Sequence, residues 1–186
     1  FLNFVGARPA RRLEDLVDDL HYPLPKQTFS NSKPRITLFS LPKSINLENE
    51  KLNSERVIEE VGAQVVASLH FWYEVYSQRG NDQFVFDSVR GVWEDYKRYV
   101  ETEMPDGRRH QLIHEGHCAF VPEKETRFVT SEMIKASGGL VGDIDEIIAR
   151  IKKLEMAGLK EIVLMPPRRV RRSNFKEFAD EIMARY

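Results

Sequence analysis

The segment from His110 to His117 holds three of the five histidines of the chain, and its residue types and spacing indicate chemistry most directly. If the segment is helical, His110, His114 and His117 share one face, because residues three and four positions apart are neighbours on a helix. Imidazoles placed in this way can bind a transition metal, contact an oxyanion or a flavin edge, or act as ordinary polar and capping groups. The residues alone leave these interpretations open.

The spacing of these histidines differs from the zinc-protease pattern His-Glu-x-x-His, since His114-Glu115-Gly116-His117 is one residue short. Gly116 also weakens the helix that would align metal ligands. We therefore predict no metal site in this segment. A histidine pair that lines a substrate pocket remains an alternative, and polar or capping histidines are the simplest interpretation.

Four arginines, Arg168, Arg169, Arg171 and Arg172, follow the apolar run 162–165 and two prolines. A basic cluster of this size suits a phosphate group or a nucleic acid, or is simply a solvated loop. It lies just past the end of a predicted strand, where α/β proteins place their ligand sites. A phosphate-binding role for these arginines is therefore one hypothesis.

The elements that must position these groups include a strand–helix–strand pattern over residues 140–165. Asp143 is expected to cap the helix, and Glu146 completes an aspartate version of the capping box. Gly158 follows the last apolar turn and predicts a left-handed cap. The apolar run 162–165 is typical of a strand buried on both faces. Parallel strands joined by a crossover helix form a βαβ unit, so the pattern predicts an α/β protein.

Outside this unit, the sequence predicts one strand and several helices. Residues 35–40 alternate between polar and apolar types and are rich in residues that favour strands, which predicts a strand. Residues 54–78 and 88–104 carry apolar residues every three or four positions, which predicts helices. Asn174 is expected to cap the last helix. Because aromatic residues at helical spacing usually pack, we expect Trp72 to lie in the core rather than to form a ligand platform.

The composition is that of an ordinary globular chain of 186 residues with a formal net charge of −1. Such a charge gives no general attraction to nucleic acid or anionic membrane, and no apolar run is long enough to span a bilayer. Cys118 is the only cysteine, which fits a reducing, cytoplasmic compartment. We divide the chain into residues 1–34, of unclear origin, and residues 35–186. Without an initiator methionine, the chain is expected to begin inside a longer protein.

From about Glu55 to Tyr186, the chain resembles the bacterial luciferase-like family of flavin- or deazaflavin-dependent oxidoreductases. That family typically closes its barrel with a Gly-x-x-x-Glu turn, a helix ending in Ala-Gly and an Ile-Val-Leu strand. The stretch from His110 to Val129 and the helix end from Ser68 to Glu74 are also similar to one branch of it. The main residues that carry the resemblance are Leu140-Val141-Gly142-Asp143-Ile144-Asp145-Glu146-Ile147, Leu154-Glu155-Met156-Ala157-Gly158-Leu159 and Glu161-Ile162-Val163-Leu164.

The resemblance implies the C-terminal portion of a (β/α)8 TIM barrel, with reduced FMN or deazaflavin bound at the C-terminal ends of the strands. The expected chemistry is hydride transfer or monooxygenation of a small organic substrate, in which the protein orients the cofactor. By this analogy the catalytic candidates are His114 and His117, the substrate-binding candidates are His70, Trp72 and His110, and the cofactor-binding candidates are Gly142, Arg168 and Arg169.

A full barrel needs about 250 residues and eight strands. Since three convincing strands are predicted here, the chain is either a fragment or a reduced relative that completes its sheet with another copy or a missing N-terminal half. The alternative function is a non-catalytic α/β interaction module that docks a partner through the apolar faces of helices 54–78 and 88–104. The oxidoreductase hypothesis predicts a histidine-lined cavity beside strands 140–141 and 161–165, whereas the module predicts dispersed histidines and an exposed apolar groove.

Overall fold

The structure, a computed structural model, describes residues 36–41 and 43–186; the segment 1–34 lies outside the described residues. Short 3-10 helices occur at Asp87–Val89, Asp106–Arg108 and Glu123–Phe128, and a π-helical turn occurs at Phe178–Met183. The other elements are, in chain order, β1 (Ile36–Leu41), β2 (Lys43–Ile45), α2 (Glu55–Arg79), α3 (Arg90–Glu103), α4 (Arg109–Leu112), α5 (Ser131–Ala136), β3 (Leu140–Gly142), α6 (Ile144–Met156), β4 (Leu159–Leu164) and α7 (Arg171–Glu177).

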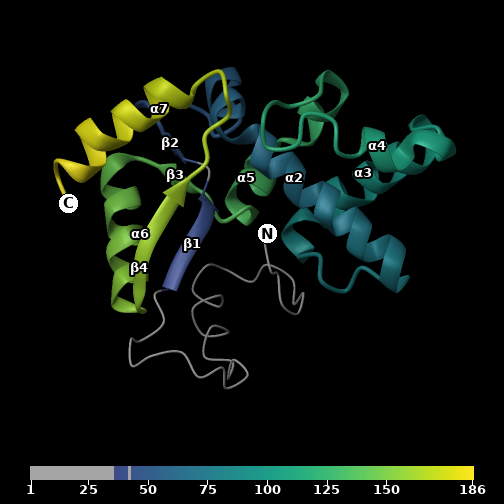
Figure 1. Ribbon diagram of the computed structural model, residues 1–186, viewed down its shortest axis with the longest axis horizontal. Helices are drawn as coiled ribbons and strands as arrows, with labels where there is room; N and C mark the ends of the chain where they lie inside the picture. Colours follow the sequence, from purple (N-terminus) through teal and green to yellow (C-terminus); the bar gives the residue numbers. More distant parts are fainter. Residues whose placement is uncertain (1–35, 42) are drawn as a thin grey trace, which may run out of the picture.

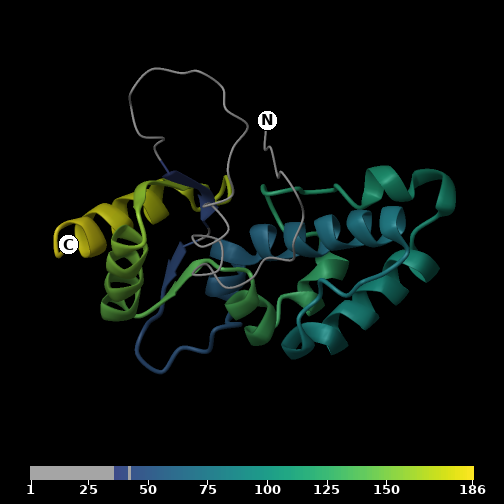
Figure 2. The ribbon, with the colours of Figure 1, turned by 90° about the horizontal axis from the view of Figure 1, so that it is seen from below.

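The elements form two neighbouring parts, which are seen side by side in Figure 1. The strands lie with α6 and α7 in one part, and α2, α3, α4 and α5 form the other. The view from below in Figure 2 shows α2 running alongside α3 through the helical part. Because α2 contacts β2 as well as α3 and α5, this helix joins the two parts.

The strands form two parallel pairs, β1 with β4 and β2 with β3. The α/β class with parallel strands that the sequence predicts is therefore confirmed. β3, α6 and β4 follow one another as expected for a βαβ unit, but within the described residues β3 and β4 are not paired with each other. β2 pairs with β3 and β1 pairs with β4, so each of the two has its own partner strand.

Two predictions about the strands are wrong. β4 is not buried on both faces, because Lys160 and Glu161 are exposed and residues 162–164 are only half-buried. The short strand β2 is a second strand outside the βαβ unit, where the sequence predicts only residues 35–40. Three residues are too few to show a periodicity, and the Lys43 side chain would not be expected inside.

Lys43 is nevertheless buried, because α7 provides polar partners for it. Its Nζ pairs with the carboxylate of Glu177 and lies 3.5 Å from the carbonyl oxygen of Asn174. The Nδ2 of Asn174 in turn donates to the Lys43 carbonyl oxygen at 2.9 Å. Asn174 therefore fastens α7 to β2 and does not cap that helix, contrary to the sequence prediction; the N-cap position is Val170.

The predicted helix ends are confirmed at several places. Ser54 caps α2 by accepting a hydrogen bond from the backbone N–H of Val57. Asp143 and Glu146 form the reciprocal capping box of α6. Gly158, just after α6, has a φ of +105°, which side-chain-bearing residues rarely adopt. These signals are local, and the sequence alone is sufficient to read them.

The described residues form two hydrophobic cores. The larger lies between α2 and α3 and is rich in aromatic rings, including the fully buried Trp93 and Tyr96. The smaller core packs β2 and β3 against α6 and the π-helical turn Phe178–Met183 through residues such as Leu140, Ile147 and Ile182. The apolar faces of α2 and α3 therefore face the interior of the molecule.

Candidate functional site

One ring nitrogen from each of His70, His114 and His117 lies within 4.8 Å of the other two. His70 comes from the middle of α2, whereas His114 and His117 come from the turns that follow α4. The ring centroids of His70 and His117 are 6.0 Å apart, and those of His114 and His117 are 5.5 Å apart. We call these three residues the histidine cluster.

The segment that carries two of these histidines is not a continuous helix. α4 ends before His114, and the chain continues in turns, where the His117 N–H donates to the His114 carbonyl oxygen at 3.2 Å. Gly116 has a φ of +71°, and a Cβ there would meet a backbone oxygen at 2.5 Å, so this turn requires glycine. The segment is not helical throughout, so the condition under which His110 would share a helix face with the other two is not met. His110 is exposed outside the cluster, and His70 is its third member.

The His70 ring is in hydrogen-bond contact with a buried carboxylate. Its Nε2 lies 2.8 Å from Oε2 of Glu125, and both side chains are 1% exposed. Its Nδ1 is buried and has no hydrogen-bond partner among the described residues. In the neutral ring, a carboxylate that accepts from Nε2 places the ring proton there and leaves Nδ1 with a free lone pair.

His114 has a carboxylate partner of its own on α2. Its Nε2 lies 2.8 Å from Oε1 of Glu74, and both side chains are 43% exposed. The pKa of His117 is lowered, mainly because burial removes water from around its ring. The neighbouring His70 and His114 lower the pKa further, because they would repel a positive charge on the ring. The cluster therefore combines one deeply buried ring with two rings at the surface.

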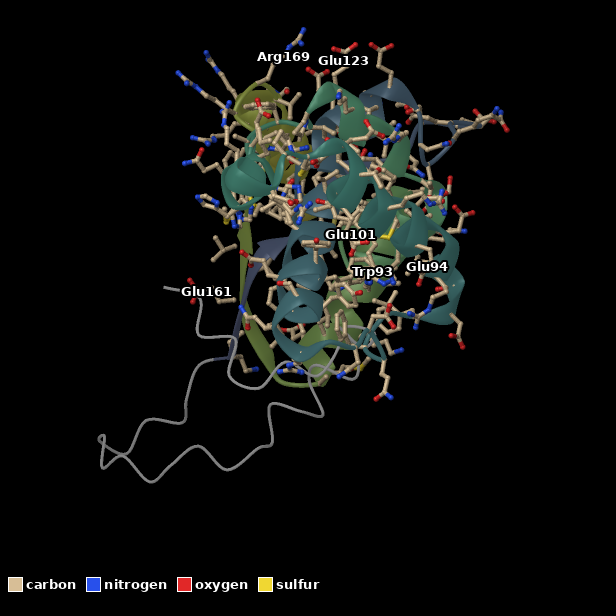
Figure 3. The ribbon with its side chains drawn as sticks, turned by 90° about the vertical axis from the view of Figure 1, so that its right-hand side faces the viewer. Trp93, Glu94, Glu101, Glu123, Glu161 and Arg169 are labelled. Atoms are coloured by element: carbon tan, nitrogen blue, oxygen red, sulfur yellow. The ribbon has the colours of Figure 1, made fainter. Side chains whose placement is uncertain are left out.

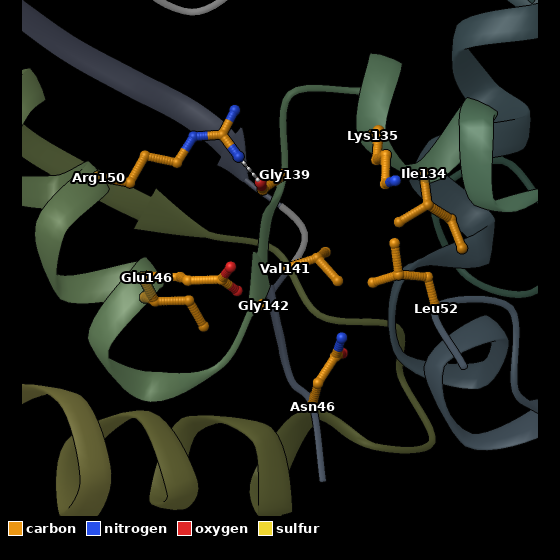
Figure 4. A pocket seen from close by; sticks show the side chains of 10 residues that line it. Asn46, Leu52, Ile134, Lys135, Gly139, Val141, Gly142, Glu146 and Arg150 are labelled. Carbon is orange, nitrogen blue, oxygen red and sulfur yellow. Dashed lines mark hydrogen bonds between the residues drawn. The ribbon is translucent and has the colours of Figure 1, made fainter. Parts of the chain in front are cut away.

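A separate cavity of about 640 Å³ runs along β3, from Gly139 just before the strand to Gly142 at its end and Asn46 just after β2. Its polar lining includes Asn46, Lys135, Glu146 and Arg150, and Figure 4 shows Arg150 reaching Gly139 while Glu146 lies beside Gly142. Arg150 donates from Nη1 to the Gly139 carbonyl oxygen at 2.8 Å. Apolar side chains, among them Leu52, Ile134 and Val141, complete the lining. No histidine of the described residues lines this cavity, so it is not the histidine-lined cavity that the oxidoreductase hypothesis predicts.

Of the three predicted cofactor-binding residues, Gly142 lies in the cavity wall and the two arginines do not. A Cβ at position 142 would meet Oε2 of Glu146 at 2.5 Å, because that carboxylate folds back over the start of α6. Arg168 is exposed, and Arg169 is 88% exposed with its Nε 3.0 Å from the Glu59 carboxylate. Figure 3 shows Arg169 projecting from the surface, away from the helical core around Trp93.

Trp72 lies in the aromatic core rather than in a binding site. Its ring meets the rings of Phe86 and Trp93 edge to face, at centroid distances of 6.4 and 6.3 Å. The side chain is 3% exposed, which is the packing role that its position on the helix stripe predicts. It cannot touch a substrate without opening this core.

Sequence reasoning missed several residues that the structure places at the two sites. Asn46, Lys135 and Arg150 line the cavity, and Glu74 and Glu125 support the histidine cluster. Of these five, Glu74 alone has a signal in the sequence, because it lies four residues after His70 and so shares its helix face. The others come together through tertiary contacts that no local sequence pattern indicates.

Comparisons with protein-family models, with curated proteins and with solved structures give no match for this chain. Its function must therefore be inferred from the fold, the cavity and the histidine cluster. Among the described helices, none combines the length and the apolar character that crossing a membrane requires.

Proposed function

We propose that this chain is part of a luciferase-like oxidoreductase that binds reduced FMN or a deazaflavin in the cavity beside β3. The observation that carries the proposal is this cavity, which runs along β3 and reaches the C-terminal ends of the parallel strands β2 and β3 at Asn46 and Gly142. Ligands of α/β proteins bind at that end of the strands. The capped turn from β3 into α6 also includes the residues on which the family resemblance rests.

The lining of the cavity suits a cofactor of this class. Its volume of about 640 Å³ falls in the range of small-molecule sites. Lys135 and Arg150 supply positive charge for the anionic groups of the cofactor, while Oδ1 of Asn46 is a buried acceptor without a partner among the described residues. A ring N–H of a flavin or deazaflavin would satisfy that acceptor.

One part of the cavity does not suit an anion. The start of α6, where a phosphate would gain from the helix dipole, is filled by the carboxylate of Glu146, which accepts the Asp143 N–H at 3.0 Å. We therefore assign the anionic groups of the cofactor to the side of the cavity that carries Lys135 and Arg150. Gly142 contributes the close turn between strand and helix rather than a phosphate contact.

The bound cofactor would supply hydride transfer or oxygen activation to a small organic substrate. The residues of this chain would hold its polar groups and exclude water with Leu52, Ile134 and Val141. The histidine cluster belongs to the other part of the molecule and does not line the cavity, so we assign it no step in this chemistry.

Each described sheet has two strands, so a barrel would require strands from elsewhere. We propose that a second copy or an N-terminal half supplies them, because unpaired strand edges favour pairing with another chain. The interaction-module alternative has less support, because the apolar faces of α2 and α3 are buried against each other among the described residues.

A fluorescence titration tests the proposal. The tag-free chain of 186 residues is titrated with oxidised and reduced FMN and with a deazaflavin, and its oligomeric state is measured alongside. Saturable binding of one cofactor class supports the proposal and selects its chemistry. A folded chain that binds none of them would reject the proposal and leave the interaction module as the leading alternative.

A further inference from the structure

We propose that His70, His114 and His117 form a three-histidine site for a divalent first-row transition metal, for which Zn²⁺ is the probe. This site lies outside the cavity beside β3, and the proposal does not depend on flavin or deazaflavin binding. It rests on the convergence of three ring nitrogens within 4.8 Å of one another, from two segments far apart in the chain.

The surroundings of His70 point to a ligand on its free side. A histidine that binds a metal usually donates its other ring N–H to a carboxylate, which fixes the orientation of the ring. Glu125 is in that position, 2.8 Å from Nε2, and the pair is buried. The remaining nitrogen, Nδ1, is a buried polar atom without a partner among the described residues, and such atoms are rare unless something binds them.

His114 repeats this arrangement at the surface. Its Nε2 is 2.8 Å from Glu74, so its other ring nitrogen is left for a ligand. Glu74 lies one helical turn after His70 on α2, so one helix provides both a proposed metal ligand and the carboxylate that orients another. A surface ion pair alone would explain the contact between His114 and Glu74, but not the gathering of three rings.

The remaining distances are small enough to close around an ion. Tetrahedral zinc with metal–nitrogen distances of ~2.0–2.1 Å brings its ligand nitrogens to roughly 3.3–3.4 Å from one another. Starting from separations within 4.8 Å, closure needs small ring movements. His114 and His117 are exposed and lie in turns, so their rings can make these movements while Glu125 holds His70.

The ligand set indicates the class of metal and its coordination. Three neutral imidazoles suit borderline ions such as Zn²⁺ and Co²⁺, whereas Ca²⁺ and Mg²⁺ prefer oxygen ligands. Three protein ligands leave a fourth position of a tetrahedral ion open to water or to a small anion. That position would lie on the side of the exposed His114 and His117 rings.

The test measures Zn²⁺ binding to the tag-free full chain by calorimetry near neutral pH. We expect one ion per chain, and we expect His114→Ala and His117→Ala each to weaken binding by about 100-fold or more; Glu125→Gln should weaken it by about 10- to 100-fold. Substitution with Co²⁺ should give the intense visible absorption of a four-coordinate ion, and this absorption should be lost in His117→Ala.

Two histidines outside the cluster provide matched controls. His110 lies on α4, close in sequence to the cluster, and His21 lies outside the described residues. Each is replaced by alanine in its own variant, His110→Ala or His21→Ala. Both should bind Zn²⁺ as the unaltered chain does. Circular dichroism of each variant establishes that it is folded. The proposal is overturned if the folded chain binds no Zn²⁺ stoichiometrically, or if the control variants lose as much affinity as His114→Ala and His117→Ala.

Discussion

The Nε2 of His70 and the Oε2 of Glu125 lie 2.8 Å apart, and neither side chain is more than 1% exposed. This buried contact joins the longest helix to the 3-10 helix Glu123–Phe128. A buried polar group that loses its partner costs far more than a surface one, because water cannot replace the lost hydrogen bond. The pair therefore matters both for stability and for the orientation of the His70 ring.

Replacing Glu125 tests the contribution of this pair to stability. Glu125→Ala should lower the free energy of unfolding by about 2–4 kcal/mol, because it leaves His70 buried and unpaired. Glu125→Gln keeps a hydrogen-bonding side chain and should cost less. Urea unfolding measures both effects. Glu123→Ala, at an exposed position of the same 3-10 helix, should change little, and an equal loss in this control would contradict the account.

The capping box of α6 gives a second prediction. Asp143→Ala should lower the free energy of unfolding by about 1 kcal/mol, because the Glu146 N–H loses the oxygen that accepts it at 2.8 Å. Asp143→Asn should restore most of this loss, since asparagine caps helices as well as aspartate does. Thermal unfolding of the three proteins provides the measurement. If Asn and Ala behave alike, the cap does not stabilise this helix.

The loop between β2 and α2 should make stability depend on pH. Hydrogen bonding to Arg56, opposed by burial, brings the pKa of Glu50 to about 2, below its usual 4.5. Because the folded pKa is depressed, the stabilisation is fully present above pH 4.5 and is lost as the pH falls towards 2. It should amount to about 1–2 kcal/mol, less than the whole shift implies, because Arg56 is 31% exposed and solvent screens the pair.

Denaturant unfolding of Glu50→Gln across this pH range measures that contribution. The variant should be less stable than the unaltered chain at neutral pH, and the difference should fade between pH 4.5 and about 2. Glu48→Gln, at an exposed position of the same loop, serves as the matched control. A difference between Glu50→Gln and the unaltered chain that stays constant with pH would show that the carboxylate charge is not its origin.

The parts of the fold that the sequence predicts are those governed by neighbouring residues. The spacing of apolar residues locates α2, α3 and α6, and the short-range pattern of Asp143 and Glu146 locates a helix start. These features depend on residues within one or two turns of each other. Strand pairing depends on distant partners, so the sequence does not indicate that residues 43–45 would lie beside β3.

The candidate sites are less predictable for the same reason. The three histidines near residue 114 suggest a local cluster, but α4 ends at Leu112, so His110 stays on the helix while a turn that requires Gly116 carries His114 and His117. His70 joins them only because α2 passes beside that turn, and its partner Glu125 comes from a third segment. Likewise, Arg150 lines the cavity from α6. The residues around it in the sequence indicate only an ordinary charged residue of a helix.

The central claim is that the cavity beside β3 binds a cofactor. Dissociation constants for reduced FMN and reduced deazaflavin test this claim most directly. They are measured for the unaltered chain and for Lys135→Met, Arg150→Met and Arg169→Met. The account predicts saturable binding that weakens about tenfold or more when either cavity cation is removed, since a charged hydrogen bond contributes about 1.5–3 kcal/mol. Arg169→Met, far out on the surface, should bind normally. Absence of saturable binding by the folded chain, or an equal loss in all three variants, would contradict the claim.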